Sequence, residues 1–210
     1  MDFPILSSLI LLPLLGAIFI FFSKSKSNTY LTIKYLAIFV SFANFILSLY
    51  LWYLFDPSTA EFQFLEEQSW IKGFINYKVG IDGISILFII LTAFIAPLCI
   101  VSVNSTVKYR LKDFLVAILV MESLMIGVFC SLDLVIFYLF FEGGLIPMFL
   151  IIGIWGGERR VYSAFKFFLY TLLGSVLMLV AIISIYWFTG STDITYLYNL
   201  GIDEKYQYLL

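Results

Sequence analysis

Histidine is absent from the 210 residues, and its absence excludes several kinds of chemistry. Without histidine the chain has no His-ligated haem, no His-based metal site and no histidine proton relay. Only two cysteines occur, Cys99 and Cys130, and both fall inside apolar runs. Buried single cysteines of this kind are typical of small packing residues. The sequence therefore predicts neither a metal site nor a disulfide.

Charged residues are also scarce. They make up 12% of the chain, whereas soluble domains contain about a quarter. The net charge is −2, and no basic patch is interleaved with aromatic residues, so nucleic acid is not an expected partner. Neither GxGxxG nor GxxxxGK[ST] occurs, so no nucleotide site is predicted.

Apolar residues dominate, at 62% of the chain, and they form long runs. Runs of this length predict helices that span a lipid bilayer. The predicted fold is therefore an all-α polytopic membrane protein with six transmembrane helices. The expected spans are residues 3–22, 35–54, 83–103, 113–130, 134–155 and 161–188. The first lacks the positive charge and cleavage site of a signal peptide, so we expect a retained helix.

The spans divide the chain into three predicted regions. Residues 1–112 hold three helices and an acidic external loop at 55–82, residues 113–190 hold three more helices, and residues 191–210 form a polar tail. Asp82 is expected to cap the start of the third helix. Gly156 and Gly157 are expected to end the fifth.

Lysine and arginine are distributed unevenly between alternate loops. Residues 23–34, 104–113 and 156–166 hold three each, whereas the opposite side holds only Lys72, Lys78 and Lys205. The positive-inside rule places the richer side in the cytoplasm or matrix. Both termini are then predicted on the non-cytoplasmic side, as an even number of spans requires.

Two glutamates, Glu122 and Glu142, lie deep within the fourth and fifth apolar runs. Each is about ten residues from the turn at 131–133, which puts both roughly 15 Å deep, near the middle of the bilayer. Burial favours the neutral form of a carboxyl group. Reversible protonation of such acids suits a proton relay, and intramembrane acids are functional by default.

The neighbours of Glu142 support a functional interpretation. Pro147 removes a backbone hydrogen bond near Gly143, and Gly143 and Gly144 expose backbone that can hold water beside the acid. The alternatives remain a neutral structural acid at Glu142 and an ordinary helix kink at Pro147. For Glu122 the alternative is a structural acid that faces a neighbouring helix.

Lys166 is a third candidate, in the sixth span. It lies roughly 12 Å from the middle of that span, too far in depth to pair directly with Glu142. Only a water chain could connect the two. The alternative is a lysine whose long stem reaches the membrane interface.

Three segments resemble a known family: YKVGIDGIS (77–85), SLDLVIFYLFFEGGLIPMFLIIGIWGG (131–157) and FKFFLYTLLGSVLML (165–179). They are similar to the M subunits of proton-translocating NADH:quinone oxidoreductase, or respiratory complex I, which are called subunit 4 in mitochondria. The resemblance covers most of residues 70–190. It implies that residues 113–190 belong to an antiporter-like core and that Glu142 is the essential fifth-helix glutamate. It also implies roles for Glu122 and Lys166.

The resemblance implies partners and cofactors as well. The chain would be one subunit of an enzyme, with no redox centre of its own. NADH, flavin, iron–sulfur clusters and quinone would be held by other subunits, and other membrane-arm subunits would be its partners. Its location would be a bacterial cytoplasmic membrane or the mitochondrial inner membrane.

One departure from the family leaves alternatives open. In the family, the fifth-helix glutamate is thought to pair with a lysine on a seventh helix. The given sequence stops just before the point where that helix is expected to begin. We therefore expect a fragment, a split gene product or a truncated frame. The rival functions are a membrane subunit of a cation/proton antiporter and a non-functional remnant.

Overall fold

The computed structural model describes residues 4–23, 29–71, 75–107 and 109–200. All six predicted spans are helices, and six helices are long and apolar enough to cross a membrane. The elements are α1 (Ile5–Phe22), α2 (Thr29–Leu54), β1 (Gln63–Ile71), β2 (Ile75–Ile81), α3 (Ser85–Thr106), α4 (Leu111–Cys130), α5 (Leu134–Trp155), α6 (Arg160–Thr189) and α7 (Ile194–Leu200).

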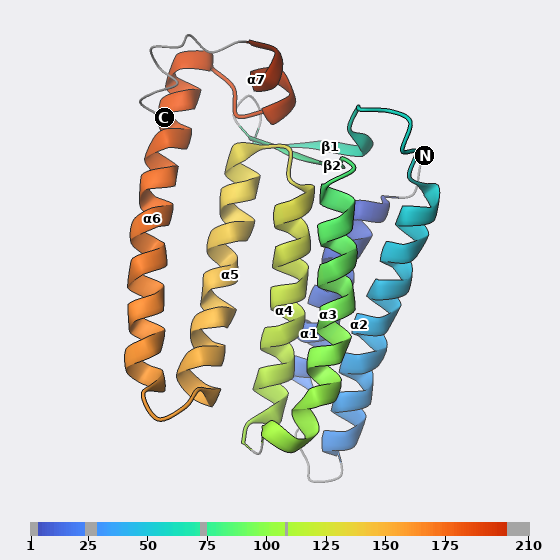
Figure 1. Cartoon of the computed structure of the whole chain (residues 1–210), viewed down its shortest axis with the longest axis vertical. Helices are drawn as coiled ribbons and strands as arrows, with labels where there is room; N and C mark the ends of the chain where they lie inside the picture. The colour runs from blue at the N-terminus through green and yellow to red at the C-terminus, as the bar shows by residue number, and fades with distance from the viewer. Residues whose placement is uncertain (1–3, 24–28, 72–74, 108, 201–210) are drawn as a thin grey trace.

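The six long helices run up and down, so that their connections alternate between two ends of the bundle (Figure 1). The strands and α7 lie at one end, which we call the hairpin end. At the opposite end α1, α3 and α5 finish and α2, α4 and α6 begin, and we call it the basic end. The alternation agrees with an even number of spans. Which end faces the cytoplasm stays a prediction.

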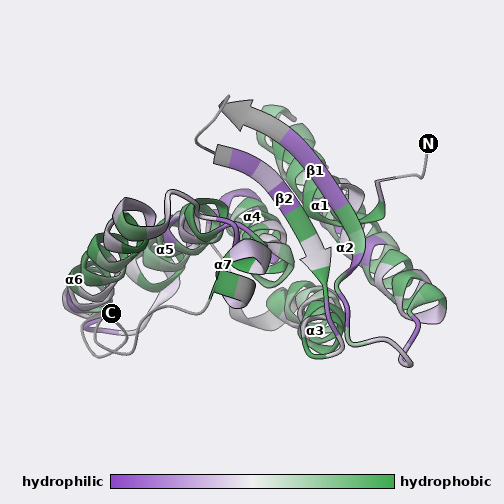
Figure 2. Cartoon of the chain, turned by 90° about the horizontal axis from the view of Figure 1, so that it is seen from above, coloured by the Kyte–Doolittle hydropathy of each residue, from purple (hydrophilic) through white to green (hydrophobic). Residues whose placement is uncertain are grey.

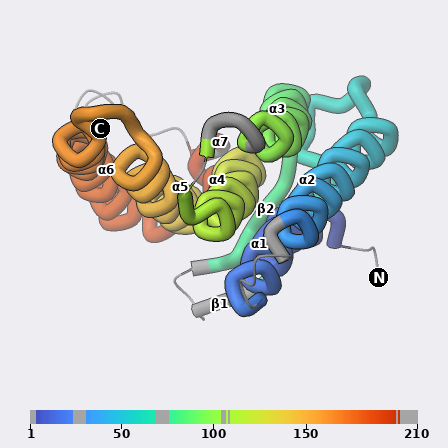
Figure 3. Tube along the Cα trace, turned by 90° about the horizontal axis from the view of Figure 1, so that it is seen from below, coloured from blue at the N-terminus to red at the C-terminus, as the bar shows by residue number. Residues whose placement is uncertain are grey.

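Helices α1–α4 form a compact bundle around two apolar clusters. The hairpin-end cluster contains Leu6, Leu9, Ile10, Leu51, Val79, Ile81, Ile86, Ile89, Ile126 and Cys130. The basic-end cluster contains Ala17, Ile20, Ile33, Ala37, Ile100, Leu115 and Leu119. Helix α5 packs on α4, and α6 packs on α5, so these three helices form a row to one side (Figures 2 and 3).

Helices α4 and α5 approach closely because small residues allow it. A Cβ atom at Gly127 on α4 would lie 2.7 Å from the ring of Phe140 on α5, so only glycine fits there without movement of the ring. At the other end of α5, a Cβ atom at Gly156 would collide with the carbonyl oxygen of Ile152. The helix ends at this glycine, as predicted, although its backbone is extended, with φ −67° and ψ 178°.

The loop predicted at 55–82 contains a two-stranded antiparallel hairpin that the sequence pattern does not predict. Its register pairs Gln63 with Ile81 and Gln68 with Tyr77. The hairpin lies across the ends of α1–α4 and carries hydrophilic residues on β1 (Figure 2). Glu66 on β1 accepts hydrogen bonds from the backbone N–H groups of Leu6, at 2.8 Å, and Ser7, at 3.1 Å. These two N–H groups have no partner within the first turn of α1, so the carboxylate satisfies them and anchors the hairpin.

Aspartates lie just before two of the helices and accept hydrogen bonds from their first N–H groups. Asp133 precedes α5 and accepts hydrogen bonds from Val135 N at 2.8 Å and Ile136 N at 3.2 Å, as an N-cap does. Asp82 accepts from Ser85 N at 2.7 Å, but α3 starts at Ser85 with Ile84 as its N-cap, so Asp82 lies two residues before the cap that the sequence predicted it to be.

One predicted boundary is wrong, and the predicted tail contains a short helix that was not predicted. The second helix starts at Thr29, so Lys34 lies within α2 and is buried, not in a loop. The tail predicted at 191–210 contains α7, and residues 201–210 lie outside the described part of the chain. Ile33 and Ala37 of α2 pack in the basic-end cluster, which stabilises this first part of the helix.

Candidate functional site

Glu122 lies on α4 inside the α1–α4 bundle, with 3% of its surface exposed. Its carboxylate accepts two hydrogen bonds from α2: from Ser41 Oγ at 2.9 Å and from Asn44 Nδ2 at 2.8 Å. Ser41 and Asn44 are themselves fully buried. Buried polar groups need such partners, because an unpartnered one costs about 1–3 kcal/mol. The structure thus shows that Glu122 faces α2.

Ser41 and Asn44 were not among the residues predicted for the site. They are three residues apart, which puts both on one face of α2. Ser48 follows on the same face and is also fully buried. The sequence does show these polar residues at helical spacing inside an apolar run, which could have indicated a buried polar face on this helix. It could not identify their partner, because the pairing of α2 with α4 is a tertiary contact.

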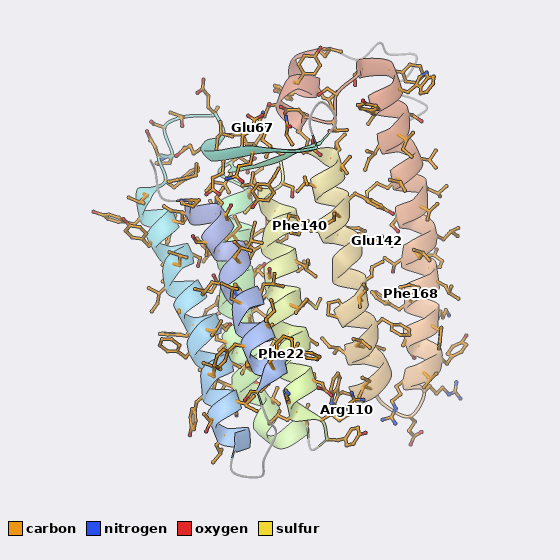
Figure 4. All side chains as sticks on the ribbon, turned by 180° about the vertical axis from the view of Figure 1, so that it is seen from behind. Phe22, Glu67, Arg110, Phe140, Glu142 and Phe168 are labelled. Atoms are coloured by element: carbon orange, nitrogen blue, oxygen red, sulfur yellow. The ribbon has the colours of Figure 1, made fainter. Side chains whose placement is uncertain are left out.

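Glu142 lies on α5, and its environment differs from that of Glu122 on α4. It shares one face of α5 with Phe149 and Gly153, seven and eleven residues further on. Phe149 contacts Phe165 and Phe168 of α6, and Gly153 lies against Ala164 of α6. Glu142 therefore faces α6, in agreement with Figure 4, where it lies between α5 and α6. Its Oε2 atom is buried and has no hydrogen-bond partner among the described residues.

The two glutamates lie at similar depths but do not meet. Gly127 lies opposite Phe140, and Gly143 opposite Leu124, across the antiparallel α4–α5 pair. This register puts Glu142 level with residue 125, three residues from Glu122, which is about 4.5 Å along the axis. The prediction of similar depth is thus close. Since Glu122 faces α2 and Glu142 faces α6, the structure provides two separate acidic sites.

The predicted neighbours of Glu142 divide into packed and open positions. Pro147 is buried inside α5, and Gly143 packs against Leu124. Gly144 has no side chain within 4 Å of where its Cβ would lie. The contact of Gly153 with Ala164 also puts Ser175 of α6 level with Glu142 on the facing side. Ser175 is buried, and its hydroxyl donates to Leu172 O at 3.0 Å within its own helix.

Lys166 lies on the exposed side of α6. Its ammonium group is 6.0 Å from the ring centroid of Tyr162, one turn earlier in the helix. It is nine residues before Ser175 and therefore roughly 13 Å from the level of Glu142. The structure does not bring Lys166 and Glu142 together, which agrees with the expected separation in depth.

A polar cluster at the hairpin end ties three segments together. Asp133 accepts from Thr192 Oγ1 at 2.6 Å, and Lys78 of β2 forms an ion pair with Asp193 at 2.6 Å. Partial burial by itself would raise the pKa of Asp193, but hydrogen bonds from Lys78 and Thr195 outweigh it and hold this pKa below its usual value. Among the described residues no three His, Cys, Asp or Glu side chains are grouped to hold a metal ion.

Comparisons with known proteins identify related chains. Residues 131–210 match the family model described as NADH:quinone oxidoreductase/Mrp antiporter, TM. NADH-quinone oxidoreductase subunit M of Rhodobacter capsulatus is 58% identical over 161 residues, which cover 77% of this chain and 31% of that protein. NADH-ubiquinone oxidoreductase chain 4 of Marchantia polymorpha is 46% identical over 207 residues, which cover 98% of this chain and 41% of that protein.

A solved structure gives the same result for the fold. A chain of respiratory complex I from Thermus thermophilus with bound NADH superposes with a TM-score of 0.75 at 29% identity, over 90% of this chain and 37% of that chain. The fold defines a multi-pass helical membrane protein of the antiporter-like class. In particular, the chain is a homologue of NADH-quinone oxidoreductase subunit M, or chain 4, and spans about two fifths of the length of most of these relatives.

Proposed function

We propose that this chain is part of the proton-translocating M-type membrane subunit of NADH:quinone oxidoreductase. The observation that carries the proposal is the carboxyl group of Glu142, held inside the membrane-length helix α5 with one oxygen buried and without a partner among the described residues. It stands in the segment FFEGGLIPM, within the stretch that matches the family model. Glu142 is half-buried, and a carboxyl group that has no fixed partner on its buried oxygen is suited to gain and lose a proton.

Glu142 would hold the proton, and its surroundings would decide when the proton leaves. In an apolar site the neutral acid is favoured, whereas a nearby cation favours the carboxylate. Lys166 is exposed and points away, so we expect the controlling cation to come from outside the described residues. Ser175 lies level with Glu142 on the facing side of α6, and its hydroxyl donates within its own helix. Pro147 and Gly144 leave room and free backbone where water can reach the acid.

The redox chemistry would take place elsewhere in the complex. NADH, flavin, iron–sulfur clusters and quinone belong to other subunits in this proposal, and this chain contributes only proton transfer. Helix α6 exposes large apolar side chains along its length, among them Leu169, Leu173 and Leu177. This face would contact lipid and other parts of the membrane arm. The membrane would be a bacterial cytoplasmic membrane or a mitochondrial inner membrane.

Replacement of one atom tests the proposal. Glu142→Gln in the assembled complex keeps the shape but removes the titrating group, so we expect NADH-driven proton pumping in membrane vesicles to fall at least tenfold. Glu61→Gln, at an exposed loop position, is the matched control and should pump normally. Normal pumping and assembly with Glu142→Gln would refute the role of Glu142. A chain that never co-purifies with a large membrane complex would favour a remnant.

A cation/proton antiporter subunit is the second candidate, because the matching family model covers Mrp antiporters as well. The two functions differ in what drives the proton. Pumping that requires NADH and stops with a quinone-site inhibitor supports the oxidoreductase. Sodium-dependent proton exchange in vesicles without NADH supports the antiporter.

A further inference from the structure

A layer of polar side chains crosses the α1–α4 bundle at the level of Glu122. We call it the polar layer, and it consists of Ser41, Asn44, Ser48, Glu122 and Ser123. Every member is at most 3% exposed. Ser123 joins the layer to α1 by donating to Ile10 O at 2.5 Å. The layer lies between the hairpin-end cluster and the basic-end cluster.

The hydrogen-bond partners of Glu122 are of a kind that suits either protonation state. A serine hydroxyl can donate or accept, and an asparagine amide offers two donors and an acceptor. With ionised Glu122, Ser41 and Asn44 both donate, which is compatible with the two hydrogen bonds in the structure. With protonated Glu122, the hydroxyl of Ser41 or the amide oxygen of Asn44 can accept instead. A fixed structural acid needs only one of these arrangements.

Asn44 supplies an independent indication of a ligand. Its Oδ1 atom is fully enclosed and has no hydrogen-bond donor among the described residues. An acceptor buried in this way costs free energy unless a donor reaches it, and buried water commonly provides that donor.

On the buried face of α2, the side chains next to the layer are smaller and more polar toward the basic end than toward the hairpin end. The buried face of α2 continues from Ser41 to Lys34, two turns earlier and 7% exposed. Between Lys34 and Ser41 this face carries Ala37, whose side chain is a single methyl group. Towards the hairpin end the same face meets Leu51, packed with Leu6, Leu9 and Ile126. The only charged residues on α1–α4 are Lys34, Lys112, Asp113 and Glu122.

We propose that the polar layer is a second proton-binding site, separate from that of Glu142. In this site Ser41 and Asn44 position Glu122. A water molecule donates a hydrogen bond to Asn44 Oδ1, and protons enter from the Lys34 end of α2. The role of Glu122 as a proton carrier deepens the proposed function, but the site does not depend on pumping by Glu142. Ser41 and Asn44 are positioning residues, because they act through Glu122.

The experiment uses dicyclohexylcarbodiimide, which reacts with protonated carboxyl groups in apolar surroundings, on the assembled protein in membrane vesicles. Adducts at Glu122 and Glu142 are quantified separately by mass spectrometry across a pH series. We expect the pH at which Glu122 labelling is half-maximal to move upward by about one unit in Ser41→Ala and again in Asn44→Leu, since each removes a donor to the carboxylate. Labelling of Glu142 should not change.

Three controls keep the result specific. Ser41→Thr keeps the hydroxyl and should restore the wild-type pH profile. Tyr50→Phe changes an exposed position on the same helix and should have no effect. Where a variant assembles poorly, the Glu142 adduct in the same sample gives the amount of folded protein. An unchanged Glu122 profile in both Ser41→Ala and Asn44→Leu would overturn the proposal, and so would absence of Glu122 labelling at every pH.

The direction of access has its own test. A Glu158→Cys variant reports, through an impermeant maleimide, which side of a vesicle carries the basic end. With a pH difference across the membrane, Glu122 labelling should follow the pH on that side, and Lys34→Met should slow its response at least threefold. Labelling that follows the other side would refute entry from Lys34. A high-resolution map should show water about 3 Å from Asn44 Oδ1. An empty position there would refute the water site.

Discussion

Asn44 on α2 donates a hydrogen bond to Glu122 on α4, with Nδ2 and Oε1 2.8 Å apart, although 78 residues separate them in the chain. This contact fixes the direction in which Glu122 points and separates it from Glu142. It also joins two helices through polar atoms inside an apolar bundle. Such contacts in membrane proteins contribute modestly when complete, but a partner left alone is costly.

Removal of the carboxyl group should therefore destabilise the bundle. Glu122→Leu leaves Ser41 Oγ and Asn44 Nδ2 buried without their acceptor, and we expect a loss of about 2–3 kcal/mol. Glu122→Gln keeps an oxygen that can accept, so its loss should be smaller, about 1 kcal/mol. The midpoint of thermal unfolding in detergent measures both. Equal stability of the leucine variant and the wild type would contradict the hydrogen bonds shown here.

The close approach of α4 and α5 predicts sensitivity at Gly127. A methyl group there would lie 2.7 Å from the ring of Phe140, so Gly127→Ala must displace the ring or the helix, at a cost of about 1–3 kcal/mol. Gly174→Ala is the matched control, because nothing lies within 4 Å of its Cβ position. Alanine should favour the helix there by up to about 1 kcal/mol. The same unfolding assay should show opposite signs for the two variants.

The ion pair between Lys78 and Asp193 predicts a dependence of stability on pH. Because the pKa of Asp193 is lowered in the folded state, its contribution is present above the ordinary value and is lost as the pH falls through the folded-state value. Asp193→Asn should therefore cost about 1 kcal/mol at neutral pH. The difference from wild type should close in acid, below about pH 4. Stability curves measured across pH test this directly.

A second ion pair serves as the control for that experiment. Arg110 and Asp113 are also 2.6 Å apart, but their side chains are 48% and 37% exposed. Water screens an exposed pair, so Asp113→Asn should change stability by less than about 0.5 kcal/mol. A large effect at Asp113 together with none at Asp193 would show that burial is not what decides the strength of these pairs.

Asp133 performs two tasks at the hairpin end, and variants can separate them. Asp133→Ala removes both the cap of α5 and the acceptor for Thr192, and we expect a loss of about 2 kcal/mol. Thr192→Val removes only the link, and about 1 kcal/mol should be lost. Hydrogen exchange of the α5 first turn should increase in Asp133→Ala and stay unchanged in Thr192→Val. If the first turn of α5 exchanged faster in both variants, the cap at Asp133 would depend on the hydrogen bond from Thr192.

The sequence predicted the membrane spans well, because the length of an apolar run and the rise per residue of a helix are local properties. Helix ends at Asp133 and Gly156 were also predictable, since capping depends on a few adjacent residues. The hairpin was not predicted. Its strands pair through backbone atoms over the ends of the bundle, and their polar sequence resembles any interfacial loop.

The site was predicted in part. The depth of Glu122 and Glu142 could be counted from a turn, and the structure places them within about one helical turn of each other. The direction in which each acid points could not be obtained by counting residues along the chain. It depends on the rotation of each helix about its axis, which is set by contacts such as Gly127 with Phe140.

By itself, then, the sequence determined six membrane-length helices, their end signals and the depth of two acids, because all of these follow from residue types at fixed spacing along one helix. Only the tertiary structure decided that Glu122 is held by Ser41 and Asn44 while Glu142 faces α6 with an oxygen unpartnered among the described residues. It also decided that Lys34 lies buried within α2 and that Lys166 lies exposed. The physical reason is that polar partners inside a bundle are chosen by how neighbouring helices pack, and this packing joins residues far apart in the chain.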